Sequence, residues 1–341
     1  MMKNLIILLM IVTCVLANKH SKDSNERQNR RKFDNHLKRY GKKYKDLPEE
    51  VRARRRNNYL KNLDFIEKHN KNPKNKFQLG SNEFSDRDPK TFVKEMCRTE
   101  LPQMTRGLPL PPSIYTSTTP ARSTVDWRTQ YTQPIVSQGG CASCSAFSVV
   151  SVIEAYNEIR GRGKTAMSQQ NIVDCHSVKC LGGWPKSIFD WLKNTYGNKL
   201  ARATDYPYTS GRTKTAGSCK VAQYVPLNYT STFLFVPNGN TATLKQIISN
   251  YGPVAIAVQV TNSGLFQNYK SGIFTDATCP GPNQCTIINH AMVAVGYGKL
   301  TTGQEYFIIR NSWGTTWGEN GYIRMAMSNT CNVACYAMGI E

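Results

Sequence analysis

The chain has 341 residues, 40% of them hydrophobic, which is enough for two ordinary domains or one large domain with extensions. Lysine and arginine number 44 against 23 acids, for a formal net charge of +21, and there are 11 cysteines. No run of 18 or more apolar residues occurs, so the sequence excludes a membrane-spanning helix. This amino-acid composition also excludes collagen-like, low-complexity and fully disordered proteins.

The first residues predict export. Lys3 precedes an apolar run from Leu5 to Leu16, and Ala17 ends a stretch that a signal peptidase can read. We expect a signal peptide over residues 1–17, with a buried N-terminal strand as the alternative. Export leads through an oxidising compartment to the outside or to a lysosome-like compartment, so cysteines should pair and the sequon at Asn228 becomes available for glycosylation.

The next segment is basic and helical in pattern. Residues 18–116 carry a net charge of +12, which taken alone suggests a polyanion-binding face. Apolar residues recur there at helical spacing, which favours two helices between about 24 and 70 with solvated basic faces. Residues 77–80 predict a short strand. Residues 108–120, rich in Pro, Ser and Thr, predict a linker open to proteolysis.

Beyond the linker the pattern changes from helices to strands. Residues 143–159 predict an amphipathic helix that ends at a glycine. Residues 254–260, 291–295 and 306–309 are short runs of strand formers. We therefore expect one domain with a helix-rich first half and a strand-rich second half.

Reactive side chains gather around the expected helix. Cys144 lies in its first turn, where the helix dipole favours a thiolate. A thiolate needs a base to form an ion pair with it and to protonate the leaving group. After residue 118 the histidines are His176, in a cysteine-dense loop, and His290, which opens an apolar strand that can hold it rigidly. Asn311, beside a tryptophan, is the candidate to orient the imidazole.

These residues resemble the papain-like cysteine proteases of the cathepsin L kind, in which histidine and asparagine follow far downstream of the cysteine. The whole chain resembles the preproenzyme of that family, with signal peptide, propeptide and peptidase. The matching blocks are residues 125–128, 138–148, 168–175, 180–183, 289–291 and 311–322. The basic segment is similar to the family's propeptide through a spaced helical pattern and a second motif, at Arg55, Tyr59, Asn62, Ile66, Asn70 and residues 80–86.

The resemblance implies an α+β, papain-like fold with a helical left lobe and a strand-rich right lobe, preceded by a helical propeptide. It implies a signal peptide at 1–17, an inhibitory propeptide and linker at 18–119 and a peptidase domain at 120–341. The implied function is a thiol endopeptidase that works through an acyl-enzyme and is made as an inactive precursor. It needs no cofactor or metal, and its partners are protein or peptide substrates and its own propeptide. We expect a monomer that binds no specific nucleic acid.

The family's catalytic roles fall on four residues. Cys144 would be the nucleophile, His290 the base and acid, and Asn311 the orienting group. Gln138 would donate its side-chain amide to the oxyanion, together with the backbone N–H of Cys144. Ala142 and Ser145 stand where the family usually has Gly and Trp, which we expect to slow or reshape activity without abolishing it. A catalytically impaired family member that acts by binding therefore stays an alternative, as does a secreted polyanion-binding protein.

The remaining cysteines are expected to be structural. The resemblance implies the disulfides Cys141–Cys180, Cys175–Cys219 and Cys279–Cys331, and elimination leaves Cys285 to pair with Cys335. Export argues against zinc as the competing use of these cysteines. Cys97 falls in the propeptide.

By position, an apolar pocket receives the second substrate side chain before the scissile bond. Its expected residues are Trp184, Pro185, Ala257, Ile288 and Tyr336, with Gly182 and Gly183 beside them. Apolar walls favour Leu or Val, with Phe limited by Tyr336 and Arg left without a carboxylate partner.

Overall fold

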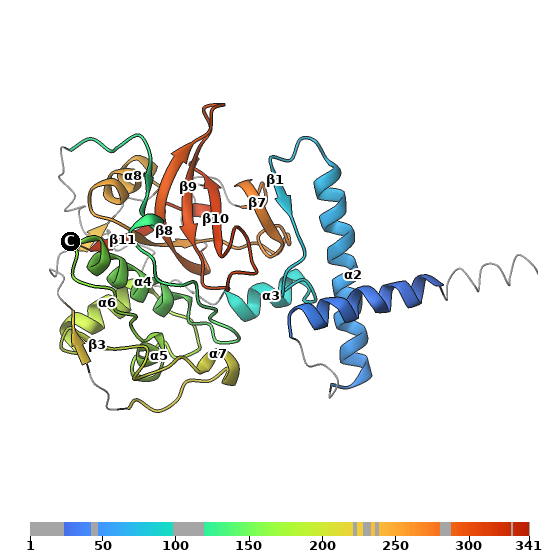
Figure 1. Cartoon of the computed structure of the whole chain (residues 1–341), viewed down its shortest axis with the longest axis horizontal. Helices are drawn as coiled ribbons and strands as arrows, with labels where there is room; N and C mark the ends of the chain where they lie inside the picture. The colour runs from blue at the N-terminus through green and yellow to red at the C-terminus, as the bar shows by residue number, and fades with distance from the viewer. Residues whose placement is uncertain are drawn as a thin grey trace, which may run out of the picture.

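The computed structural model describes residues 24–41, 47–97, 119–220, 224–227, 233–235, 239–279, 288–328 and 330–340 (Figure 1). The expected signal peptide, the sequon at Asn228, Cys285 and most of the linker lie outside these residues. Those expectations remain predictions. Within the described residues no helix is long and apolar enough to cross a membrane.

The N-terminal part contains the two expected helices, a strand and a third helix. Its elements are a helix over residues 24–39, α2 (Glu49–Lys71), β1 (Phe77–Leu79) and α3 (Pro89–Met96). Helix α3 begins at Asp88, whose carboxylate accepts a hydrogen bond from the Thr91 N–H at 2.9 Å, and Pro89 occupies the first helical position. Figure 1 shows these elements together on one side of the molecule, with α3 nearest to the rest of the chain.

The left lobe is built around one buried helix. Its elements are α4 (Cys144–Ile159), α5 (Gln169–Cys175), α6 (Pro185–Asn194), α7 (Ser210–Thr213) and the small sheet of β3 (Lys199–Ala201) and β4 (Tyr224–Pro226). The expectation that this central helix is amphipathic is wrong. Every residue from Cys144 to Tyr156 is buried, because α5, α6 and the large sheet pack around α4. The glycine stop is correct: Gly161 has a left-handed φ of 68° just beyond the helix.

The right lobe is a large, mostly antiparallel sheet. Its strand order is β1, β7 (Tyr269–Phe274), β10 (Tyr322–Ala326), β9 (Glu305–Arg310), β8 (His290–Lys299), β6 (Val254–Val258), β11 (Tyr336–Ile340) and β5 (Phe233–Phe235). Helix α8 (Thr241–Asn250) packs against it, two short 3-10 helices cover Trp127–Thr129 and Thr330–Asn332, and β2 (Val125–Asp126) pairs with β8. Gly296 permits this pairing, because a Cβ there would lie 2.3 Å from the carbonyl oxygen of Val125.

The propeptide extends this sheet and binds the loop before β7. Strand β1 pairs antiparallel with β7. The Asn82 amide donates to the Gln267 carbonyl at 2.8 Å, and the Gln267 amide donates back to the Phe84 carbonyl at 2.7 Å. Asn62 of α2 donates to the Ser85 carbonyl at 2.7 Å. The motif over residues 80–86 therefore joins α2 to the peptidase.

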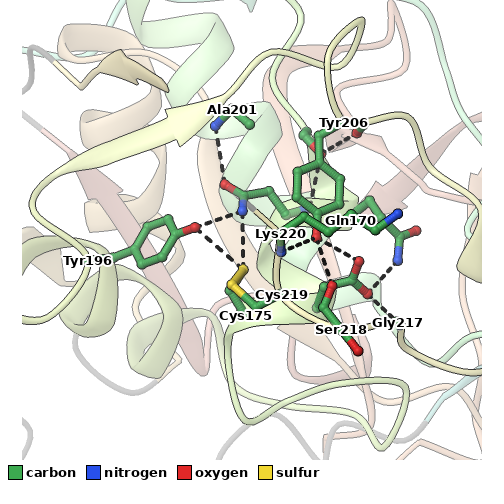
Figure 2. The surroundings of a disulfide bond; sticks show 12 residues. Gln170, Cys175, Tyr196, Ala201, Tyr206, Gly217, Ser218, Cys219 and Lys220 are labelled. Carbon is green, nitrogen blue, oxygen red and sulfur yellow. Dashed lines mark hydrogen bonds between the residues drawn. A yellow bond between two sulfur atoms is a disulfide. The ribbon is translucent and has the colours of Figure 1, made fainter. Parts of the chain in front are cut away.

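Three of the expected disulfides are confirmed, namely Cys141–Cys180, Cys175–Cys219 and Cys279–Cys331. Cys335 is also disulfide-bonded, while its expected partner Cys285 lies outside the described residues. Figure 2 shows the surroundings of Cys175 and Cys219, where Asp174 accepts hydrogen bonds from Gly217 N–H at 2.6 Å and Tyr206 O–H at 2.9 Å. The disulfide and these bonds together hold the loop on α5. Among the described cysteines, Cys97 and Cys144 form no disulfide.

Candidate active site

Cys144 is the first residue of α4 and is fully buried. Its sulfur accepts a hydrogen bond from the Ala291 N–H at 3.5 Å. The turn before it is held by the Cys141–Cys180 disulfide and by the Ser143 N–H, which donates to the Cys141 carbonyl at 2.8 Å. A cysteine at a helix N-terminus faces the positive end of the helix dipole, which stabilises a thiolate.

His290 and Asn311 lie side by side on neighbouring strands. His290 begins β8, and Asn311 directly follows the last residue of β9. His290 Nε2 and Asn311 Oδ1 are 2.8 Å apart. The Ser312 N–H also donates to this oxygen at 2.8 Å, so it is an acceptor and Nε2 carries the proton. The other ring nitrogen, Nδ1, has no hydrogen-bond partner among the described residues and is the basic one.

The two lobes bring the thiol and the imidazole to one point. Ala291, which contacts the sulfur of Cys144, directly follows His290 in β8. The indole of Trp313 stacks on the imidazole with ring centroids 4.6 Å apart and an interplanar angle of 28°. Burial lowers the pKa of His290 to about 4, against a smaller upward effect of its hydrogen bond to Asn311. The imidazole is therefore neutral in this closed form at neutral pH.

The other histidine of the peptidase part serves a local structural role. His176 begins the loop after α5, as expected, and its Nδ1 accepts a hydrogen bond from the Val178 N–H at 3.1 Å. Its ring contacts Trp191 edge-on at 5.2 Å. Both contacts lie within the left lobe, so His290 is the histidine that the fold brings to Cys144.

Gln138 is fully buried and fixed at both ends of its side chain. Its Nε2 donates to the Cys141 carbonyl at 3.1 Å, and its Oε1 accepts from the Ser312 hydroxyl at 2.7 Å. The same Nε2 also donates to the carbonyl of Met96 at 3.3 Å. Met96 is the last residue of α3, so the propeptide backbone occupies the position that this amide faces.

Propeptide side chains also cover the histidine. The Phe92 ring meets the Trp313 indole edge-on at 5.0 Å, and the Phe84 ring does so at 5.8 Å. Met96 is fully buried, and Cys97 is 6% exposed. The contact sequence Phe92, Trp313, His290 links α3 to the imidazole.

Several residues at the site were missed by sequence reasoning. Ser312 fixes the Gln138 amide, and its place next to Asn311 was the available signal. Met96 and Phe92 carried no signal of their own, because their role depends on where α3 docks.

The expected substrate pocket is partly assembled. The Trp184 and Tyr336 rings meet edge-on at 4.9 Å, and Tyr336 of β11 lies opposite Ala257 of β6. Ile288 is buried, and the residue after it bonds through its N–H to the carbonyl of Val258 at 3.0 Å. The remaining expected residues follow the Cys180 disulfide: Gly182 with a left-handed φ of 90°, Gly183 packed on Val178, and Pro185 at the start of α6.

The two departures from the family pattern lie on either side of Cys144. Ala142 forms an isolated parallel bridge with Leu181, so its extra methyl is accommodated in the turn. Ser145 is fully buried, and its hydroxyl oxygen has no hydrogen-bond partner among the described residues. Neither residue displaces Cys144, His290 or Asn311 from the arrangement described above.

Comparison with known proteins identifies the family. The papain family cysteine protease profile matches residues 121–340, and the cathepsin propeptide inhibitor domain profile matches residues 33–92. The chain belongs to the papain family of cysteine proteases. It is a cysteine endopeptidase with an inhibitory propeptide, and its basic N-terminal segment is largely that inhibitor domain. The fold is papain-like, as the resemblance implied.

Relatives and solved structures agree. The chain is 35% identical over 308 residues to the thiol protease aleurain of Arabidopsis thaliana, covering 88% of this chain and 80% of aleurain. It is 31% identical to cathepsin S of Bos taurus, covering 87% and 88% of the two chains. Digestive procathepsin L 3 of Tenebrio molitor aligns with a TM-score of 0.79 and 27% identity, over 92% of this chain and 98% of that one. Within the described residues no group of three or more His, Cys, Asp or Glu could hold a metal ion.

A buried carboxyl lies behind the site, between the lobes. Glu154 of α4 accepts hydrogen bonds from the Met167 N–H and the Tyr131 O–H, each at 2.9 Å. It lines a cavity of about 70 Å³ together with Arg310 and Asn311. Burial raises the pKa of Glu154 to about 7, although both hydrogen bonds oppose the shift.

Glu154→Gln should make the peptidase less sensitive to pH. Between about pH 4.5 and 7 the folded carboxyl retains a proton that the unfolded chain has lost. The free energy of unfolding is therefore highest below the unfolded pKa of Glu154 and falls as pH rises through the folded pKa of about 7. Each pKa unit is worth about 1.4 kcal/mol, so the loss approaches about 3 kcal/mol. Urea unfolding between pH 4 and 8 measures it, with Glu158→Gln on the same helix as the control. An unchanged pH slope in Glu154→Gln would show that Glu154 does not titrate in this window.

Proposed function

We propose that Cys144, His290, Asn311 and Gln138 form the catalytic machinery of an exported endopeptidase. The observation that carries the proposal is the hydrogen-bonded His290–Asn311 pair next to a cysteine thiol at a helix N-terminus. The three groups come from two lobes that pack together, which favours a catalytic constellation over a local structural contact.

Each residue has a defined step. His290 Nδ1 takes the proton of Cys144, and the thiolate attacks the peptide carbonyl to form a tetrahedral intermediate. The Gln138 amide and the Cys144 N–H donate to its oxyanion. The imidazolium then gives its proton to the leaving amine, which leaves an acyl-enzyme. A water molecule deprotonated by His290 hydrolyses the acyl-enzyme and restores the thiol. Asn311 holds the ring through Nε2 throughout.

Contacts of residues 119–122 with the peptidase support the proposed domain limits of the precursor. The Thr119 carbonyl accepts a hydrogen bond from Asn250 at 3.1 Å, and the Arg122 guanidinium donates to the Ser249 carbonyl at 2.8 Å. We place the propeptide and its linker at 18–119 and the peptidase at 120–341, after a signal peptide at 1–17. Export to the secretory pathway or a lysosome-like compartment, glycosylation at Asn228, a monomeric state and the Cys285–Cys335 disulfide belong to the same proposal. Disulfides in the peptidase fit an oxidising compartment.

Cys144→Ala should abolish hydrolysis without unfolding the protein. The variant loses the nucleophile, so we expect kcat/KM to fall by about 10⁴-fold or more. The kcat/KM of Asn311→Ala should fall less, by about 10- to 100-fold, because this variant loses the group that orients the imidazole but keeps the proton carrier. The assay uses a fluorogenic peptide and enzyme whose propeptide has been removed by an added protease, with thermal unfolding as the check on folding. Activity of Cys144→Ala within about tenfold of wild type would contradict the assignment.

The precursor should be inactive at neutral pH and convert in acid, with a new N-terminus between about Ser113 and Arg122. Burial raises the pKa of Asp88, but the hydrogen bonds from Thr91 outweigh it and hold that pKa below 3.8. The cap of α3 is therefore present above this value and lost as pH falls through the lowered pKa.

Two substitutions of Asp88 separate loss of the helix cap from loss of its titrating carboxylate. Asp88→Ala removes a cap worth about 1 kcal/mol and should raise neutral-pH activity of the precursor about fivefold. Asp88→Asn keeps an acceptor without a titrating group, so it should stay inactive at neutral pH and convert more slowly in acid. Conversion is followed by gel and by N-terminal sequencing. Full activity of uncleaved wild-type precursor at neutral pH would refute the latency.

The pocket formed by Trp184, Ala257, Ile288 and Tyr336 should select Leu or Val over Phe, and all three over Arg. Burying such an apolar side chain contributes about 1.5–3 kcal/mol, and the rings of Trp184 and Tyr336, which contact each other edge-on, supply two of its walls. Tyr336→Ala should shift the preference toward Phe. A peptide library varied at this position measures it. A profile led by Arg, or no change in the variant, would show that these residues do not form the pocket.

A further inference from the structure

The propeptide carries a free cysteine at the point where it leaves the active site. Cys97 directly follows α3, and its N–H bonds to the carbonyl of Val93 at 2.9 Å. It is buried, and Cys97 and Cys144 are the two described cysteines that form no disulfide.

The backbone next to Cys97 contacts the segment that leads to Cys144. The carbonyl of Met96, bonded directly to the nitrogen of Cys97, accepts the Gln138 amide at 3.3 Å. The same amide donates at 3.1 Å to the carbonyl of Cys141, three residues before Cys144. One side-chain nitrogen therefore joins the residue before Cys97 to the turn that precedes α4.

Aromatic packing fixes α3 in this position. Phe92 meets the Trp313 indole, which stacks on His290, and Ala291 next to His290 contacts the Cys144 sulfur. The electrostatics agree: burial is the main cause that raises the pKa of Cys97, and negative charge on Cys144 raises it further. This contribution agrees with the contacts that bring the end of α3 to the start of α4.

We propose that Cys97 and Cys144 form a disulfide that holds the precursor inactive until it is reduced. The proposal rests on Cys144 being the nucleophile of the enzyme. The structure then represents the reduced precursor, in which both sulfurs remain thiols.

The chemistry needs an oxidant, and a glutathione-type disulfide of the secretory compartment supplies it. The Cys144 thiolate attacks this disulfide, forms a mixed disulfide and expels one thiolate, which takes the proton of Cys97. The Cys97 thiolate then attacks the sulfur of Cys144 and expels the second thiolate. Two protein thiols are oxidised to one disulfide, and one small disulfide is reduced to two thiols.

Reduction of this disulfide should begin by attack on the Cys97 sulfur. A thiol at a helix N-terminus is the better leaving group, so an incoming thiolate that attacks the Cys97 sulfur releases Cys144 directly. The bond would also keep the inhibitor attached after cleavage in the linker, because the three disulfides found in the described chain all lie within the peptidase. Acid cleavage alone would then not release the active site.

The test uses the full precursor equilibrated at pH 8 in glutathione buffers of increasing disulfide content. Samples are quenched in acid, alkylated under denaturing conditions, digested and mapped by mass spectrometry. We expect a cross-linked peptide pair containing Cys97 and Cys144. Oxidised precursor should then convert at acid pH at least about tenfold more slowly without reductant than with it. Cys97→Ser and Cys97→Ala should form no cross-link and lose this difference.

A gel supplies a second readout. Oxidised wild type cut in the linker should run as one species without reductant and as two species with it, whereas Cys97→Ser should run as two in both. If Cys144 binds only glutathione, or both thiols stay free at every ratio, the latch is overturned. Failure of the proposed function looks different: reduced, acid-processed wild type would not hydrolyse peptides, whatever the map shows.

Discussion

The packing of α4 against β8 is the constraint on which the site depends. It sets the N-terminus of a helix from the left lobe against the first residues of a strand from the right lobe, so that Ala291 N–H reaches the Cys144 sulfur. The helix is buried on nearly every side, which fixes where its first turn lies. Because β8 and β9 are hydrogen-bonded neighbours, the same packing also positions His290 and Asn311 near that first turn. A shift of the lobes would separate the thiol from the imidazole and would also disrupt the core that α4 shares with β8 and β11.

The propeptide binds next to this α4–β8 contact and touches both lobes. It adds β1 to the sheet edge, seats Phe92 on Trp313 and presents the Met96 carbonyl to Gln138. The Gln138 amide is the group that we propose donates to the oxyanion, and on that proposal the inhibitor takes a hydrogen bond that the reaction would use. The inhibitor thus competes for catalytic hydrogen bonds as well as for space.

Much of this was predictable from sequence where the signal is local. The two basic helices, the strand at 77–79 and the residues Cys144, His290 and Asn311 follow from spacing, residue type and order along the chain. The amphipathic reading of α4 failed because Ser145, Ser148 and Ser151 look like a polar face. These small side chains are instead buried, and the Ser148 hydroxyl bonds back to the Ser145 carbonyl at 2.9 Å. Strand β8 exceeds its expected range because Gly296 and Gly298, poor strand formers, are paired with β9. The contact of Met96 with Gln138 joins segments far apart in sequence and leaves no local signal.

Burial of the site gives latency an electrostatic part. A cysteine protease of this kind needs an imidazolium to accompany its thiolate, yet in the closed precursor desolvation lowers the pKa of His290 to about 4. With Phe92, Met96 and Cys97 covering the site, the imidazole of His290 is neutral at neutral pH. We expect removal of α3 to expose the imidazole and to raise the pKa of His290 toward its ordinary value. On the catalytic roles proposed above, the propeptide therefore withholds the imidazolium that would accompany the thiolate.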